Sequence, residues 1–176
     1  AGDRVEVVLG TTGFYVESGG QVSDMGTIRG DGWLIEIEDV KRPVGGLVTH
    51  VGEVVEGRPQ VGDMATAEVD ADRREAITRN HTATHLLHAA LRNRLGDHVQ
   101  QRGSLVAPDR LRFDFVHDSK IDSNTLRAIE DEINGIILSN YAVQPVEKSL
   151  QEARKEGAMA LFGEKYGDRV RTISII

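Results

Sequence analysis

The chain has 176 residues, six histidines and no cysteine, and its formal net charge is −7 at pH 7. This length allows one ordinary domain or two small ones with a buried core. No run of about 18 apolar residues could cross a membrane, and neither end resembles a signal or transit peptide. The lack of cysteine excludes disulfides and thiolate chemistry, and the acidic balance argues against a general polyanion binder. We therefore expect a cytoplasmic protein.

The first 70 residues carry the pattern of short strands. The runs VEVVLG, WLIEIEDV, GLVTHVGEVV and ATAEVD are separated by glycine, aspartate and proline, without a helical period. This spacing is typical of a small antiparallel barrel. The segment is also strongly acidic, with 5 basic and 13 acidic side chains. We predict a β-barrel-like subdomain over residues 1–70.

The pattern becomes helical from Asp70 to about Leu95, where Gly96 supplies a stop. The stretch HTATHLLH, residues 81–88, holds half of the chain's histidines. At 100° per residue, these three rings fall within about 60° of one another. The apolar residues of the same helix gather on its opposite side: Ala83, Leu86, Leu87, Ala90 and Leu91. One helix thus presents an aliphatic back and an imidazole front.

Two further strands, HVQQRGSLV and LRFDFVH, predict a hairpin, because the connecting APDR favours a reversal. Residues 122–139 predict a helix with Asp122 or Ser123 as its cap. A strand over VQPVEKSL, a short helix near 150–157 and a final strand over VRTISII complete the chain. For residues 71–176 we predict an α+β core in which helices pack on one face of a mainly antiparallel sheet.

A basic segment surrounds the histidine helix. Residues 71–117 carry 8 basic and 5 acidic side chains, in contrast to the acidic first part. The segment could meet a phosphate-bearing substrate, or its arginines could simply be solvated. These arginines are Arg73, Arg74, Arg79, Arg92, Arg94, Arg102, Arg110 and Arg112.

The histidine front is a candidate metal site. His81 and His85 are four residues apart, so their rings can point at one ion from the same helix face. Taken alone, the pair is a weak signal: it fits half of a zinc site, and it also fits histidines that lie on the helix surface or are held by hydrogen bonds. A metalloprotease motif would need glutamate beside the first histidine, and Thr82 stands there instead.

A second candidate site is GTTGFYVESGGQVSDMG, residues 10–26. The two consecutive glycines allow backbone to approach a ligand closely, and the amide of Gln21 can both donate and accept hydrogen bonds. The segment fits a strand and polar turn that line a pocket. It also fits a glycine-rich hairpin without a ligand.

Together, TTGFYVESGGQVSDMG, RNHTATHLLHAALRNRLGDHVQQRGS and LRFDFVH resemble, in order, the editing domain of alanyl-tRNA synthetase, most closely the bacterial type. Free-standing alanyl-tRNA editing proteins share the Gly-Gly-Gln and His-x-x-x-His elements, and threonyl-tRNA synthetase shares the second part. The resemblance implies a two-layer editing core of the threonyl/alanyl type. The start at Ala1 and the end in mid-strand suggest an excised fragment.

The resemblance also implies roles for individual residues. His81 and His85 match two zinc ligands of the family, whose other pair, a later Cys-x-x-x-His, is absent here. Thr12 and Gln21 would face the aminoacyl group, although Gly13 stands where the family usually has proline. His88 would be a neighbour of the ligands or a surface residue. The expected substrate-binding residues are Phe14, Gly19, Gly20 and Arg102.

The implied activity is hydrolysis of alanine tRNA mischarged with serine or glycine. A synthetic pocket distinguishes side chains that differ by a methylene by only about 1–3 kcal/mol, so a second, hydrolytic site is needed. Zn²⁺ is the implied cofactor and could be structural or catalytic. Two other functions fit the sequence: a non-catalytic tRNA-binding fragment of the synthetase, or a free-standing editing hydrolase that acts in trans.

Overall fold

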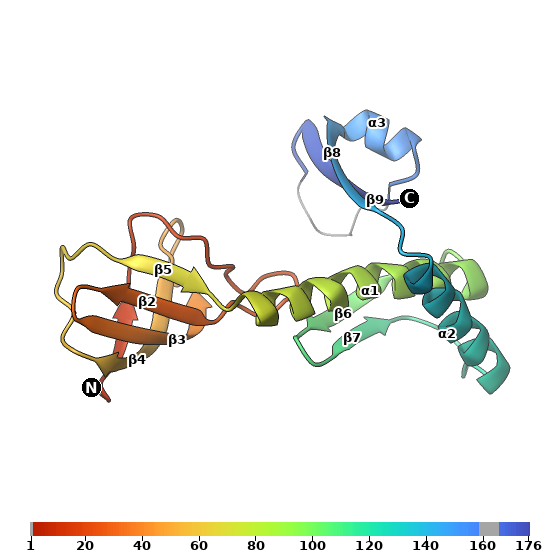
Figure 1. Cartoon of the computed structure of the whole chain (residues 1–176). Helices are drawn as coiled ribbons and strands as arrows, with labels where there is room; N and C mark the ends of the chain where they lie inside the picture. Colours follow the sequence, from red (N-terminus) through yellow and green to blue (C-terminus); the bar gives the residue numbers. More distant parts are fainter. Residues whose placement is uncertain (1, 159–165) are drawn as a thin grey trace. The chain divides into compact units, whose positions relative to one another are not determined.

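The computed structural model describes residues 2–158 and 166–176 and shows a mixed α+β chain (Figure 1). Contacts divide the chain into two compact units, Ala1–His88 with Arg102–Val116 and Ala89–Gln101 with His117–Ile176. None of the described helices is long and apolar enough to span a membrane. The elements in order are β1 (Arg4–Val7), β2 (Gly26–Gly30), β3 (Trp33–Lys41), β4 (Thr49–Glu56), β5 (Thr66–Val69), α1 (Ala71–Leu95), β6 (Gln101–Val106), β7 (Leu111–Phe115), α2 (Ser123–Leu138), β8 (Val143–Ser149), α3 (Leu150–Lys155) and β9 (Arg169–Ile175).

The acidic first part forms a five-stranded antiparallel sheet in the order β1-β4-β3-β2-β5. The four predicted strands are present. Strand β2, over GTIRG, was not predicted, because its two terminal glycines read as turn residues. The predicted barrel is not closed: among the described residues, β1 and β5 are the two edges of the sheet. Each is only four residues long, so neither offers much edge for the pairing that closure needs.

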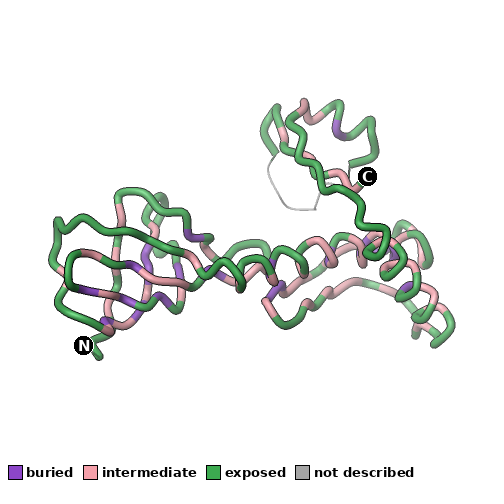
Figure 2. Tube along the Cα trace, in the orientation of Figure 1, coloured by how far each residue is buried: buried purple, intermediate pink, exposed green. Residues whose placement is uncertain are grey.

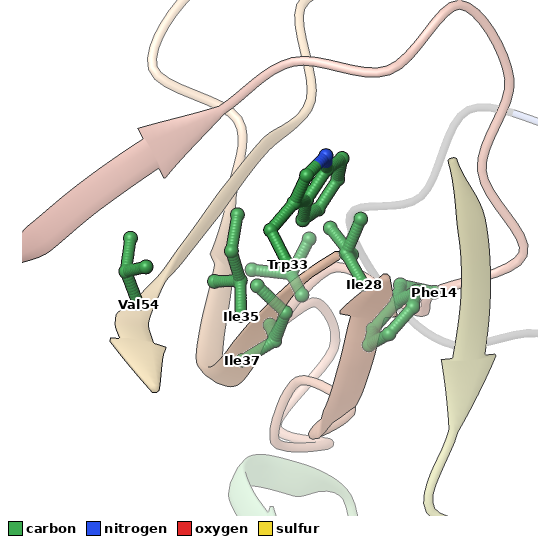
Figure 3. Packing of buried hydrophobic residues seen from close by; sticks show 7 residues of the cluster. Phe14, Ile28, Trp33, Ile35, Ile37 and Val54 are labelled. Carbon is green, nitrogen blue, oxygen red and sulfur yellow. The ribbon is translucent and has the colours of Figure 1, made fainter. Parts of the chain in front are cut away.

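The core of this sheet follows from side-chain alternation along β3. Trp33, Ile35 and Ile37 face inward, and a bulge after Ile37 shifts the register so that Val40 is buried next. Figure 3 shows Trp33, Ile35 and Ile37 on the same side of the sheet as Phe14, Ile28 and Val54, and Val40 belongs to the same buried cluster. Each fully buried isoleucine stabilises the fold by about 1.5–3 kcal/mol. Buried positions are frequent along these strands in Figure 2.

Helix α1 begins and ends where the sequence predicts. The side chain of Asp70 accepts a hydrogen bond from the backbone of Arg73 at 2.9 Å and so caps the first turn. At the other end, Gly96 takes a φ of 113° and its N–H donates to Arg92. The predicted aliphatic back is half-buried or buried, and Ala90 and Leu91 are 1% and 3% exposed.

The four elements predicted after residue 117 are present: α2, β8, α3 and β9. Asp122 caps α2 by accepting hydrogen bonds from two backbone N–H groups, and Ser149 with Glu152 forms a capping box on α3. Strands β8 and β9 pair antiparallel, with Val143 opposite Ile175. Strands β6 and β7 form a two-stranded sheet in the first unit, and β8 and β9 form another in the second. The single sheet predicted for residues 71–176 stays a prediction. The sequence pattern predicts the β6-β7 hairpin, whose two strands are neighbours in the chain, but not that β8 pairs with β9 across α3.

Candidate functional site

The Gly-Gly-Gln element forms a tight turn. Ser18 and Gln21 exchange both backbone hydrogen bonds, at 3.2 and 3.0 Å. The two residues between them, Gly19 and Gly20, have φ values of 60° and 84°, which side chains rarely adopt. Positive φ at both central positions is typical of the type I′ turn. The pair of glycines is therefore required by the backbone of the turn itself.

This turn lies directly against β6. The backbone of Val106 donates to Gly20 at 2.7 Å and accepts from Val22 at 3.1 Å, and the hydroxyl of Ser104 donates to the Gly19 carbonyl at 3.2 Å. A Cβ atom on Gly20 would lie 2.3 Å from the oxygen of Ser104, so any side chain there would push the turn away. Gly20 thus has a second role, the close approach of two backbones.

Two arginines of α1 hold the rest of the loop. The guanidinium of Arg74 pairs with the carboxylate of Asp24, which is 2% exposed, and donates to the carbonyl of Gly13 at 2.6 Å. Arg73 donates to the carbonyl of Ser23 at 2.7 Å. The hydrogen bond to Asp24 raises the pKa of Arg74. These two arginines therefore fasten the loop to the helix.

The docked turn brings Gln21 to the histidine front. His81 Nδ1–H donates to Gln21 Oε1 at 2.7 Å, although the two residues are 60 positions apart in sequence. In a neutral ring this donation leaves Nε2 with a free lone pair. The ring of His85 is stacked on that of His81, with centroids 5.1 Å apart and planes inclined by 20°.

The pKa of each ring is lowered, which favours its neutral form. His81 and His85 are exposed residues, yet the protein atoms packed around each ring displace enough water to lower its pKa. The pKa of His85 is lowered further by the neighbouring His81 and His88. Neutral imidazole is the form that binds a metal or accepts a proton.

The other predicted residues of the loop lie in a second hydrogen-bonded group. The hydroxyl of Thr12 bonds Nε2 of His50 at 2.8 Å, and Phe14 is 5% exposed within the core of the sheet. Gln21 therefore meets His81, whereas Thr12 meets His50. The roles predicted for Thr12, Phe14, Gly19 and Gly20 toward a substrate stay predictions.

The remaining predicted histidine is buried. His88 is 7% exposed, and its ring lies 5.0 Å from that of Phe113 on β7. Among residues 2–158 and 166–176, no group of three or more His, Cys, Asp or Glu side chains is placed to hold a metal ion. The zinc-ligand role predicted for His81 and His85 therefore stays a prediction.

Comparison with known proteins shows which protein family the chain resembles. Residues 1–73 match the family model described as class II (A) tRNA synthetases. The chain is 52% identical over 174 residues to the alanine–tRNA ligase of Anaeromyxobacter sp. (strain Fw109-5), and 53% identical over 174 residues to that of Acetivibrio thermocellus. The ligase of Cereibacter sphaeroides is 55% identical over 175 residues. The chain belongs to the alanyl-tRNA synthetase family. Each match covers 99% of this chain but only 19–20% of the relative's length.

Most of the basic residues in residues 71–117 are paired with acidic side chains. Arg79 bonds Glu75 one turn away, and Arg110 and Arg112 pair with Asp109 and Asp114 at about 3 Å. Among the described residues, Arg102 on β6 has no ion pair and is exposed. Side chains two apart on a strand share a face, so Arg102 lies on the same side of β6 as Ser104, which contacts the Gly-Gly turn.

Two residues that hold the site were missed by sequence reasoning. Asp24 anchors the loop through Arg74 and also accepts from the backbone of Tyr15 at 2.6 Å. His50 is wholly buried on β4. A signal for His50 was available, because it occupies an inward position of a predicted strand, in alternation with Gly52 and Val54. A titratable side chain at a core position indicates a specific partner.

Proposed function

We propose that this chain performs the proofreading hydrolysis of seryl- and glycyl-tRNA(Ala) for an alanyl-tRNA synthetase. The observation that carries the proposal is the contact between Gln21 and His81, because it joins the Gly-Gly-Gln turn and the His-x-x-x-His helix in one place. The amide and the neutral imidazoles form a polar group that can position water against an ester. Family membership supports the synthetase context, and tRNA(Ala) is the partner that we propose.

Zn²⁺ is the proposed cofactor, with His81 and His85 as two of its ligands. Their chemistry fits: the lowered pKa values favour the neutral rings, and the bond to Gln21 orients the His81 ring so that its Nε2 can bind a metal, as hydrogen-bond partners of metal-bound histidines do. When bound, zinc would polarise an ester oxygen or a water molecule. Because two imidazoles are half of a tetrahedral set, we expect weak binding and partial or no occupancy in the purified chain. One tightly held zinc per chain in metal analysis would contradict this expectation.

The test is single-turnover deacylation of seryl-tRNA(Ala) and glycyl-tRNA(Ala), with alanyl-tRNA(Ala) as the matched control. It is run with this chain and with a full-length alanine–tRNA ligase in which this segment replaces the corresponding residues. We expect both mischarged esters to be hydrolysed on the order of 10²-fold faster than spontaneously, and alanyl-tRNA(Ala) to be spared. Hydrolysis at the spontaneous rate by both proteins would refute the proposal.

One observation favours the non-catalytic alternative for the isolated chain, namely that no group of three or more possible metal ligands lies together among the described residues. That alternative has a distinct signature in the same experiment. The chain alone would bind tRNA(Ala) without hydrolysing its ester, whereas the full-length protein that carries the segment would hydrolyse it.

A further inference from the structure

His50 is a polar side chain inside an apolar core. It is 0% exposed, and its ring meets Phe14 edge-on, with centroids 5.2 Å apart and planes at 85°. A buried imidazole is costly unless both ring nitrogens have hydrogen-bond partners. Both have: Nδ1 lies 3.0 Å from the carbonyl oxygen of Val7, and Nε2 lies 2.8 Å from the hydroxyl of Thr12.

These partners fix where the protons are. A carbonyl oxygen can only accept, so Nδ1 of His50 carries the hydrogen and donates it to Val7. Burial lowers the pKa of His50, so the ring is neutral at pH 7 and Nε2 is an acceptor. The hydroxyl of Thr12 must therefore donate its single hydrogen to His50.

The hydroxyl of Thr12 has a second internal bond. It accepts from the backbone N–H of Phe14 at 3.1 Å. A hydroxyl has one hydrogen and two acceptor positions, so one acceptor position remains. Thr12 can receive a hydrogen bond from a ligand but has none left to give.

We propose that His50 is a positioning residue for editing, which fixes the Thr12 hydroxyl so that it offers the aminoacyl group an acceptor and no donor. This inference rests on the proposed function. Thr12 would then accept a hydrogen bond from the ammonium of the aminoacyl ester or from the hydroxyl of serine, because both of these groups are donors. Stabilisation of negative charge on the ester oxygen would fall to other groups, because that oxygen needs a donor.

The two nitrogens of His50 allow its structural and positioning roles to be separated. An asparagine amide at this position can place its N–H near the site of Nδ1 and keep the bond to Val7, but it cannot reach Thr12. A glutamine amide reaches the site of Nε2 and keeps the bond to Thr12, at the expense of Val7. His50→Asn and His50→Gln are thus matched variants of similar size and polarity.

The experiment measures kcat/KM for seryl-tRNA(Ala) hydrolysis in the full-length protein that carries this segment, together with the melting temperature of each variant. Each of the variants His50→Asn and Thr12→Val loses a hydrogen bond between neutral groups, so we expect each to lower kcat/KM by about 3- to 10-fold. His50→Gln should retain most of the activity. In the Thr12→Val background, His50→Asn should cause no further loss, since His50 acts through Thr12.

Equal losses in the Asn and Gln variants, or a full additional loss in the double variant, would overturn the inference and leave a purely structural histidine. If both variants fail to fold, ¹⁵N shifts of His50 in the unsubstituted chain decide: protonation at Nδ1 supports the inference and protonation at Nε2 overturns it. Failure of the proposed function looks different, because the unsubstituted protein would then not hydrolyse the ester at all.

Discussion

Two pairs of histidines in this chain have the same ring geometry and different chemistry. His81 with His85, and His98 with His117, are each stacked with centroids 5.1 Å apart and planes inclined by 20°. In the second pair, the rings bond each other through Nε2 of His98 and Nδ1 of His117 at 2.8 Å. In the first pair, the bond from His81 goes instead to Gln21.

The difference shows that stacking does not identify a ligand site. In the second pair, one ring nitrogen of each histidine is occupied by the bond to the other histidine. The hydroxyl of Ser119 lies 3.3 Å from the remaining ring nitrogen of His117. That pair fastens the turn after α1 to the segment after β7. In the first pair, a glutamine holds one nitrogen and orients the other, which is the arrangement that metal-binding histidines have in general.

The strongest way to break this comparison is to remove the glutamine. Gln21→Ala should lower deacylation of seryl-tRNA(Ala) by about 10- to 100-fold, the range typical of losing a partner that orients a ligand. Its melting temperature should change little, because a turn glutamine contributes little to a core. Single-turnover hydrolysis and melting temperature are measured on the same protein. Gln144→Ala on β8 is the control; a lower melting temperature with unchanged hydrolysis would remove Gln21 from the site.

A smaller effect is expected on the free energy of unfolding when the pH is lowered. The pKa values of His81 and His85 lie below their ordinary 6.5, so as the pH falls through 6.5 the unfolded chain takes up protons that the folded chain does not. The stabilising contribution of these two histidines should therefore be complete above pH 6.5. Below pH 6.5 the free energy of unfolding should decline, by less than about 1.4 kcal/mol per pH unit for any one histidine. Urea unfolding between pH 5.5 and 8, with a chelator present, measures this slope. His85→Gln should make the slope shallower, and an unchanged slope would contradict the lowered pKa.

The smallest effect concerns the arginine beside the site. Arg102→Ala should reduce the slope of log affinity for tRNA against log salt by roughly 0.7–0.9, the value for one lost phosphate contact. Arg110→Ala and Lys41→Ala should change it less, because these side chains pair with Asp109 and Asp39. Filter binding at several salt concentrations gives the slopes. Equal slopes for Arg102→Ala and the unsubstituted chain would mean that tRNA docks elsewhere.

Local structure was largely predictable from the sequence, because its signals are local. Asp122 as a cap, Gly96 as a stop and the APDR reversal each act within a few residues. Strand β2 was not predicted because Gly26 is there for a tertiary reason: a Cβ atom would lie 2.1 Å from the carbonyl oxygen of Glu68 on β5. No local rule distinguishes such a glycine from one in a turn.

The candidate site was predictable in its parts and not in its assembly. The motifs single out Gln21 and His81, but their contact depends on β6, which receives the turn, and on Asp24 with Arg74, which fastens the loop. Such docking between distant segments leaves no periodic pattern in a single sequence. The same holds for Thr12, whose partner His50 lies 38 residues away.

The most direct test of the account compares the two histidine pairs in one assay. Hydrolysis of seryl-tRNA(Ala) is measured in the full-length protein that carries this segment, for His85→Ala and for His117→Ala, with melting temperatures as the control for folding. The account predicts that His85→Ala loses hydrolysis by at least about 10-fold while remaining folded, and that His117→Ala lowers the melting temperature but keeps hydrolysis. Full hydrolysis by His85→Ala, or its loss in a stably folded His117→Ala, would contradict the account.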